Sequence, residues 1–141
     1  MKIAVVAVGY NRPDSMQRLL NTIEVADYGQ DVVNLIISID KGKRQAEIIN
    51  VAENMKWVHG EKVIRAFTER QGLRKHIIQC GDLTEEYDAV VVLEDDLMVS
   101  KYFYSYIKQT LMFYKNDSNI AGISLYKHQT HPGVYRPFEP V

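Results

Sequence analysis

Three adjacent carboxylates, Glu94, Asp95 and Asp96, follow directly after the apolar run AVVVL. That run is typical of a buried strand, and ligand sites in open α/β sheets lie at the carboxyl ends of strands. Neighbouring carboxylates repel one another unless a cation or hydrogen-bond donors offset their charge. Their oxygens favour hard cations such as Mg²⁺ or Mn²⁺, which also bind phosphate. The triplet therefore indicates either a metal–phosphate site or a solvated helix start, where acids are also favoured. Strand alternation predicts that Asp95 faces away from the other two.

Two other apolar runs also end in residues suited to a ligand. Asp40 follows VVNLIISI, where a carboxylate can accept a hydrogen bond from a base or a ribose, or simply form a turn before Gly42. The run IAVVAV is followed by the segment 9–12, which offers a ring, an amide and a guanidinium. These groups could stack on a base or pair with phosphate, or form a turn and helix cap. Together the three strand ends predict a nucleotide bound at the edge of a sheet.

Alternating apolar runs and helical patterns must position these residues, and this alternation predicts an α/β fold with a mostly parallel sheet. We expect strands over residues 3–8, 32–39, 62–66, 89–93 and 120–125. We expect helices from Pro13 onward and over 45–55, 72–83 and 101–114. One domain should cover residues 1–126, and the proline-rich segment 127–141 reads as an irregular tail that leaves it.

Composition excludes several classes of protein. The 141 residues carry a net charge of −1 and 25% charged side chains, which suits an ordinary globular domain and argues against a nucleic-acid binder. No uncharged apolar run approaches the roughly 20 residues of a transmembrane helix. The single cysteine, Cys80, is expected to be a small buried side chain in a reducing compartment. We therefore expect a cytoplasmic protein, whose full-length form could act at the inner membrane face.

Absent motifs narrow the choice further. There is no G-x-G-x-x-G after the first strand, no G-x-x-x-x-G-K-[ST] loop and no G-x-S-x-G elbow. Dinucleotide, P-loop and serine-hydrolase interpretations therefore have no support. His128 and His131 lie in the tail without a companion Glu motif, so a zinc site is not predicted there.

The sequence resembles the nucleotide-binding part of GT-A type glycosyltransferases, both bacterial family 2-like enzymes and the N-acetylglucosaminyltransferase I group. The resemblance rests on VAVGYNRPDSMQRLLNTI, LIISIDKG, RQGLRKHIIQCGDL and VVVLEDDLMVSKYFYSYI. In the last piece, E-D-D after an apolar strand corresponds to the family's D-x-D motif. The resemblance implies a Rossmann-like three-layer α/β/α fold, incomplete at its C-terminus, that binds a nucleoside-diphosphate sugar, usually a UDP-sugar, with Mn²⁺ or Mg²⁺.

The resemblance also implies roles for individual residues. Asp96 would be the direct metal ligand, with Asp95 near the ribose or the metal's waters and Glu94 near the donor sugar. Asp40 would contact the base, and Arg12 would reach toward the diphosphate. The implied nucleotide-sugar-binding set is Gly9, Tyr10, Asn11, Arg12, Asp40, Arg74, Glu94 and Asp95.

One segment departs from the family pattern. Arg70 stands where many relatives have the Asn of Asn-x-Gly before a helix, so that residue's role is not carried over to it. In the following helix, Arg74 or Lys75 could reach phosphate or could form an exposed helix face.

The implied reaction is transfer of the sugar to a hydroxyl of a glycan or other acceptor, with the cation offsetting charge on the leaving diphosphate. In inverting relatives a carboxylate base takes the hydroxyl proton. Relatives supply that base from a region that would follow Val141, so we expect an N-terminal piece that binds nucleotide weakly and transfers little sugar. Exposed aromatic residues on the helix over 101–114 and in the tail predict some self-association.

Three alternatives remain open at the level of sequence. A sugar nucleotidyltransferase would carry a Gly-rich G-x-G-T-R-type loop after the first strand, where this chain has GYNRP. A receiver-like or flavodoxin-like α/β module would regulate or bind without catalysis, but receiver domains place an acidic pair after the first strand. A degenerate glycosyltransferase would bind nucleotide sugar and nothing more.

Overall fold

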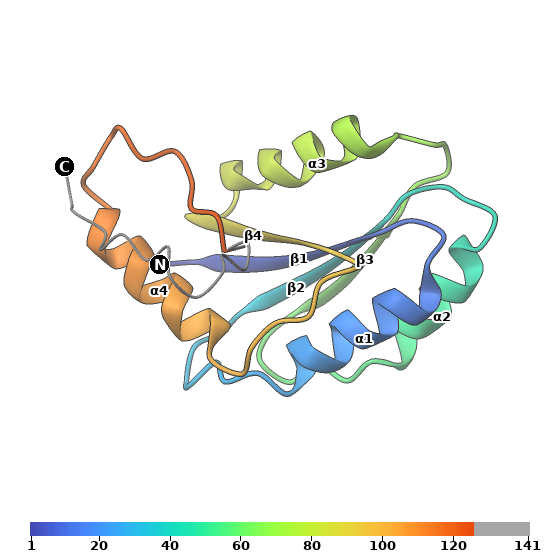
Figure 1. Ribbon diagram of the computed structural model, residues 1–141, viewed down its shortest axis with the longest axis horizontal. Helices are drawn as coiled ribbons and strands as arrows, with labels where there is room; N and C mark the ends of the chain where they lie inside the picture. Colours follow the sequence, from blue (N-terminus) through green and yellow to red (C-terminus); the bar gives the residue numbers. More distant parts are fainter. Residues whose placement is uncertain (126–141) are drawn as a thin grey trace, which may run out of the picture.

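Four parallel strands form one sheet in the order β3-β2-β1-β4 (Figure 1). The computed structural model describes residues 1–125; the predicted tail, with His128 and His131, lies outside the described residues. The strands are β1 (Ile3–Gly9), β2 (Asn34–Ile39), β3 (Lys62–Ala66) and β4 (Ala89–Glu94). The helices are α1 (Pro13–Glu24), α2 (Gln45–Asn54), α3 (Leu73–Gly81), the short 3₁₀ helix η1 (Asp82–Glu85) and α4 (Phe103–Tyr114).

Helices cover both faces of the sheet, which explains why β1 is apolar and buried along its whole length (Figure 1). Alternate β1 residues face opposite sides: Ile3, Val5 and Ala7 join the core under α1, α2 and α4. Ala4 and Val6, with their neighbour Val8, pack with the α3 side of the sheet. The three-layer α/β fold with a parallel sheet is therefore confirmed.

The predicted helices and the first four strands are present, with shifted ends. Pro13 occupies the first turn of α1, and the helical stripe Met16, Leu19, Leu20 and Ile23 is fully buried. β2 begins two residues later than predicted, because the ladder with β1 starts at Asn34 and includes neither Val32 nor Val33.

The strand predicted over residues 120–125 is wrong. Within residues 1–125 this segment forms no ladder, and Ile120 and Leu125 are exposed. The segment, β4 and α4 together line a pocket of about 540 Å³, so the segment lies near β4 without pairing with it. Apolar composition satisfied the pattern for a strand, but a strand also needs backbone pairing with a neighbour.

Lys62 joins β3 to the end of α2. Its ammonium donates to the carbonyl oxygens of Ala52 at 2.8 Å, Glu53 at 3.1 Å and Met55 at 2.7 Å. The last carbonyls of a helix have no partner within the helix and carry the negative end of its dipole, so a cation there is stabilising.

We expect Lys62→Met to lower the free energy of unfolding by about 2 kcal/mol, because it removes these charge-assisted bonds and keeps the aliphatic stem. Urea unfolding followed by circular dichroism measures the effect. Lys56→Met, at an exposed position outside the helix end, is the matched control and should change little. Equal stability of the two variants would contradict the capping role.

Candidate functional site

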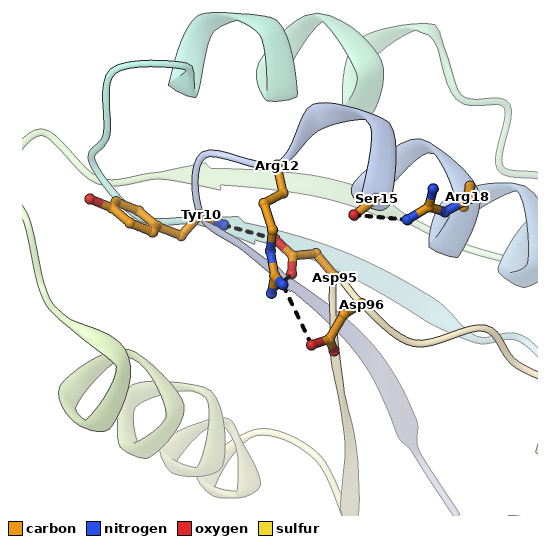
Figure 2. A network of polar contacts seen from close by, with 6 residues as sticks. All are labelled: Tyr10, Arg12, Ser15, Arg18, Asp95 and Asp96. Carbon is orange, nitrogen blue, oxygen red and sulfur yellow. Dashed lines mark hydrogen bonds and ion pairs between the residues drawn. The ribbon is translucent and has the colours of Figure 1, made fainter.

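The carboxyl ends of β1 and β4 flank the point where the strand order reverses. From β1 the chain moves outward to β2 and β3, then crosses back to place β4 on the other side of β1. Ligands of open α/β sheets bind in the crevice at such a switch point. The loops after β1 and β4 carry Arg12, Asp95 and Asp96, so the structure brings together residues that the sequence separates widely (Figure 2).

Asp95 directly follows β4 and is only 2% exposed. Its Oδ2 accepts the backbone N–H of Tyr10 at 3.2 Å, and its Oδ1 accepts a hydrogen bond from Arg12 Nη2 (Figure 2). The pKa of Arg12 is raised, chiefly by this side-chain hydrogen bond. Both Asp95 oxygens are thus engaged, and the residue ties the β1–α1 loop to the end of β4.

Asp96 and Glu94 are exposed, whereas Asp95 is buried, which agrees with the predicted separation of Asp95 from the other two. Asp96 Oδ2 lies 3.5 Å from Arg12 Nη1, and the Asp96 side chain is 55% exposed. It is therefore the acidic side chain beside Arg12 whose carboxylate is open to a ligand.

A divalent metal fits this donor set only with help from a ligand. Within residues 1–125, no group of three or more His, Cys, Asp and Glu side chains is placed to hold a metal ion. Asp95 is occupied, and of the two exposed acids of the triplet, Asp96 is the one that contacts Arg12. Mg²⁺ is commonly held by one or two carboxylates together with substrate phosphates. The residues thus fit a cation shared with a diphosphate rather than a protein-only site.

Asp40 directly follows β2, and its carboxylate accepts hydrogen bonds from the loop that precedes α3. It is 4% exposed, and its Oδ1 accepts the backbone N–H of Lys41 and of Gln71, both at 2.7 Å. Its Oδ2 accepts the N–H of Gly72 at 2.9 Å. Burial by itself raises the pKa of Asp40, but the three backbone hydrogen bonds outweigh it, so the pKa lies below its usual value.

Asn11 locks the β1–α1 loop to the β2–α2 loop. It adopts a left-handed conformation with φ 55°, and its Oδ1 accepts the backbone N–H of Arg44 at 3.0 Å. A Cβ atom at Gly42 would collide with Asn11 Oδ1 and would lie 2.8 Å from Cε2 of Tyr10. The Asn11 amide oxygen is therefore engaged with the protein, and the glycine is needed for the loops to touch.

We expect Gly42→Ala to displace the Asn11 side chain, so that the N–H of Arg44 loses its acceptor. Stability should fall by about 1–2 kcal/mol, since the new methyl group meets side chains that can shift in part. Thermal unfolding measures the change. Gly81→Ala is the matched control, because no atom lies within 4 Å of a Cβ built there.

The remaining predicted residues lie around this frame. The Gly9 backbone carbonyl accepts the N–H of Asp40 at 3.0 Å, joining two strand ends. Tyr10 presents a 37% exposed ring, and the guanidinium carbon of Arg70 lies 5.2 Å from the ring centroid. Arg74 is exposed on the first turn of α3, and within residues 1–125 no hydrogen bond or ion pair joins it to the other candidates.

A buried polar network beneath α3 was not predicted from the sequence. Ser38 Oγ lies 2.6 Å from His76 Nε2, and Arg65 Nε donates to Ser38 Oγ at 3.0 Å. Arg65 also donates to Cys80 Sγ at 3.2 Å. Burial lowers the pKa of His76 and raises that of Cys80. The signal was Ser38 and Arg65, which stand next to apolar residues within β2 and β3. The network holds α3, whose preceding loop binds Asp40, against the sheet.

The four-stranded parallel sheet with helices on both faces is an α/β fold that also occurs in solved glycosyltransferase structures. Among solved structures, the chain is similar to Staphylococcus aureus TarS (TM-score 0.61, 15% identity), with 89% of this chain matching 23% of that one. It is also similar to TarS 1–349 (0.60, 13%, 82% and 33%) and to TarS 1–349 in complex with UDP-GlcNAc (0.56, 15%, 82% and 31%).

The described chain thus spans a third or less of the TarS chains that it matches. Comparison of the sequence finds no matching family model and no significant match among curated proteins. No helix within residues 1–125 is long and apolar enough to cross a bilayer.

Proposed function

We propose that the chain forms the nucleotide-sugar-binding part of a metal-dependent glycosyltransferase that uses a UDP-sugar donor and an acceptor hydroxyl. The observation that carries the proposal is the cluster of Arg12, Asp95 and Asp96 at the strand reversal, with Asp40 at the next strand end. The likeness to a TarS structure that contains UDP-GlcNAc supports it.

Asp40 is proposed to contact the base. A carboxylate has about four acceptor positions, and three of them take backbone N–H groups here. The remaining position is on Oδ2, which has one protein partner. The N3–H of uracil is a donor suited to it, whereas cytosine offers a bare nitrogen at that position.

Arg12 and Asp96 are proposed to form the diphosphate end of the crevice. Asp96 would hold Mn²⁺ or Mg²⁺ together with the diphosphate, and the bound cation would stabilise negative charge on the leaving group. Arg12 keeps its bond to Asp95 while its other nitrogen, half-exposed, exchanges Asp96 for a phosphate oxygen. A contact this exposed costs little to break. Sugar transfer itself, proposed as inverting, needs an acceptor site and a general base that we assign to no residue of this chain.

Isothermal titration calorimetry with UDP, GDP, CMP and dTDP, each with and without Mn²⁺, tests the proposal. We expect Mn²⁺-dependent binding of UDP that weakens about tenfold or more in Asp96→Ala, because the exposed carboxylate beside Arg12 is lost. Asp117→Ala removes an exposed acid elsewhere and is the control. UDP binding that ignores both a chelator and the Asp96 substitution would overturn the metal role.

The same donor set predicts that Mn²⁺ binds weakly by itself. One carboxylate beside a guanidinium is a poor site until a diphosphate adds oxygens and occupies Arg12. Electron paramagnetic resonance should show free Mn²⁺ with the chain alone and bound Mn²⁺ once UDP is added. Tight Mn²⁺ binding without nucleotide would contradict a shared site.

Self-association is proposed from α4 and the residue before it, where Tyr102, Tyr106 and Phe113 are exposed. Sedimentation velocity over a wide concentration range should show a concentration-dependent dimer. Replacing Tyr106 and Phe113 by Ser should weaken it, whereas Val32→Ser, a distant exposed apolar position, should not. A monomer at all concentrations would contradict the proposal.

A further inference from the structure

Arg70 and Tyr10 lie in contact at the open rim of the crevice. The guanidinium carbon of Arg70 lies 5.2 Å from the centroid of the Tyr10 ring, within the range of a cation–π contact. Both side chains are exposed, and within residues 1–125 this is the one interaction that the structure gives to the Arg70 side chain. The residue is therefore free to change partner when a ligand enters.

Hydrogen bonds to Asp95 and Asp40 hold the backbone at Tyr10 and next to Arg70. Tyr10 donates its N–H to Asp95, and one edge of its ring lies against the backbone at Gly42. Arg70 directly precedes Gln71, whose N–H is bound by Asp40. In Figure 2 the Tyr10 ring points away from the acidic cluster. The pair consequently belongs to the Asp40 end of the crevice, away from the end proposed for the diphosphate.

We propose that Arg70 determines nucleoside affinity by stacking on the base, with the base held between the Arg70 guanidinium and the Tyr10 ring. This inference rests on the function proposed above and adds a residue to it. An exposed cation–π contact is weaker than stacking of a base on an aromatic ring or a guanidinium plane, so exchanging one for the other favours binding. Arg70 moves outward by the thickness of the base, and the edge of the base donates its N–H to Asp40 as proposed above.

The competing role for an exposed arginine is binding of the diphosphate. The two roles differ in three measurable ways. Stacking acts on the nucleoside alone, needs a planar group and depends little on salt. Phosphate binding requires the diphosphate, is partly retained by lysine and weakens as ionic strength rises.

Ligand-observed NMR and calorimetry on the 141-residue chain with uridine and with UDP plus Mn²⁺ separate these roles. We expect Arg70→Ala to weaken uridine and UDP by the same factor, about tenfold. Arg70→Lys should recover little of the loss because it lacks the plane. Arg18→Ala, which removes an exposed arginine from α1, is the matched control and should leave both affinities unchanged.

Tyr10, the stacking partner of Arg70, provides a second measurement, because stacking on its ring should shift the uridine ring protons upfield. Tyr10→Phe should preserve both binding and this shift, and Tyr10→Leu should lose both. Weakened UDP binding with unchanged uridine binding in Arg70→Ala would overturn the stacking role, as would unchanged binding of both ligands. If the wild-type chain binds neither uridine nor UDP, the proposed nucleotide function itself fails, and this outcome is distinct from a silent Arg70 substitution.

Discussion

Asp40→Asn should both unfold the chain more easily and abolish measurable UDP binding. The carboxylate accepts three backbone N–H groups in a nearly buried position, and an amide would turn a donor toward one of them. Leaving such buried groups unpaired costs about 3 kcal/mol. The loop that starts α3 would then lose its attachment to β2, and the base would lose its acceptor. Urea unfolding and calorimetry measure the two effects.

The pH dependence of this stability difference checks its cause. The pKa of Asp40 is lower in the folded chain than in the unfolded chain, because the backbone hydrogen bonds outweigh burial. The stabilisation is therefore complete above the unfolded pKa of about 3.9 and is lost as pH falls through the lower folded pKa. The gap between wild type and Asp40→Asn should stay constant from about pH 5 to 8 and shrink below about pH 4. A gap that widens in acid would contradict the assignment.

Asp95→Asn should destabilise the chain and remove nucleotide binding, whereas Asp96→Ala should affect binding alone. Asp95 is buried and bonded to Arg12 and to the N–H of Tyr10. Losing its charge leaves Arg12 without its main partner, at a cost of about 2 kcal/mol given that the guanidinium is half-exposed. Asp96 makes one long contact in an exposed position, so its loss should cost little stability.

A double-mutant cycle isolates the pair. The stability change of the double variant should differ from the sum of the changes in Arg12→Ala and Asp95→Asn, because each single substitution removes the same interaction. Asp31→Asn with Lys108→Ala is a reference for an ion pair at a distant site. Additive effects for Arg12 and Asp95 would mean that the contact contributes nothing beyond each residue alone.

The sequence predicted β1 and β2 well because both are apolar runs that are buried along almost their whole length, and helical spacing marks the helices. Alternation also separated Asp95 from Glu94 and Asp96, but only the structure shows that Asp95 is the buried one. The strand prediction for residues 120–125 was wrong because composition does not show whether the edge of a neighbouring strand pairs with the segment. β2 begins at Asn34 because neither Val32, which is exposed, nor Val33, which is buried, pairs with β1, and an apolar run does not show where pairing starts.

The interior of the site was harder to predict, since its main donors are backbone groups. Nothing in the identity of Gln71 or Gly72 reveals that their N–H groups bind Asp40; the positive φ of Gly72 before a helix is visible only in the structure. Likewise, the sequence proposed Asn11 as a ligand group, while its oxygen binds a neighbouring loop. Side-chain chemistry can be read from sequence, but which partner takes each oxygen depends on the tertiary fold.

The reactivity of Cys80 can report on the opening of helix α3 from the sheet. It is the only cysteine of the chain, it is fully buried, and burial raises its thiol pKa, so it should be inert in the folded state. A thiol reagent can then modify it only when α3 lifts from the sheet, and the labelling rate measures the free energy of that opening. Nucleotide should slow the labelling if the Asp40 loop and α3 respond to it together. Because the Cys80 thiol should not react in the folded state, a single cysteine introduced elsewhere could be labelled without background from the native thiol.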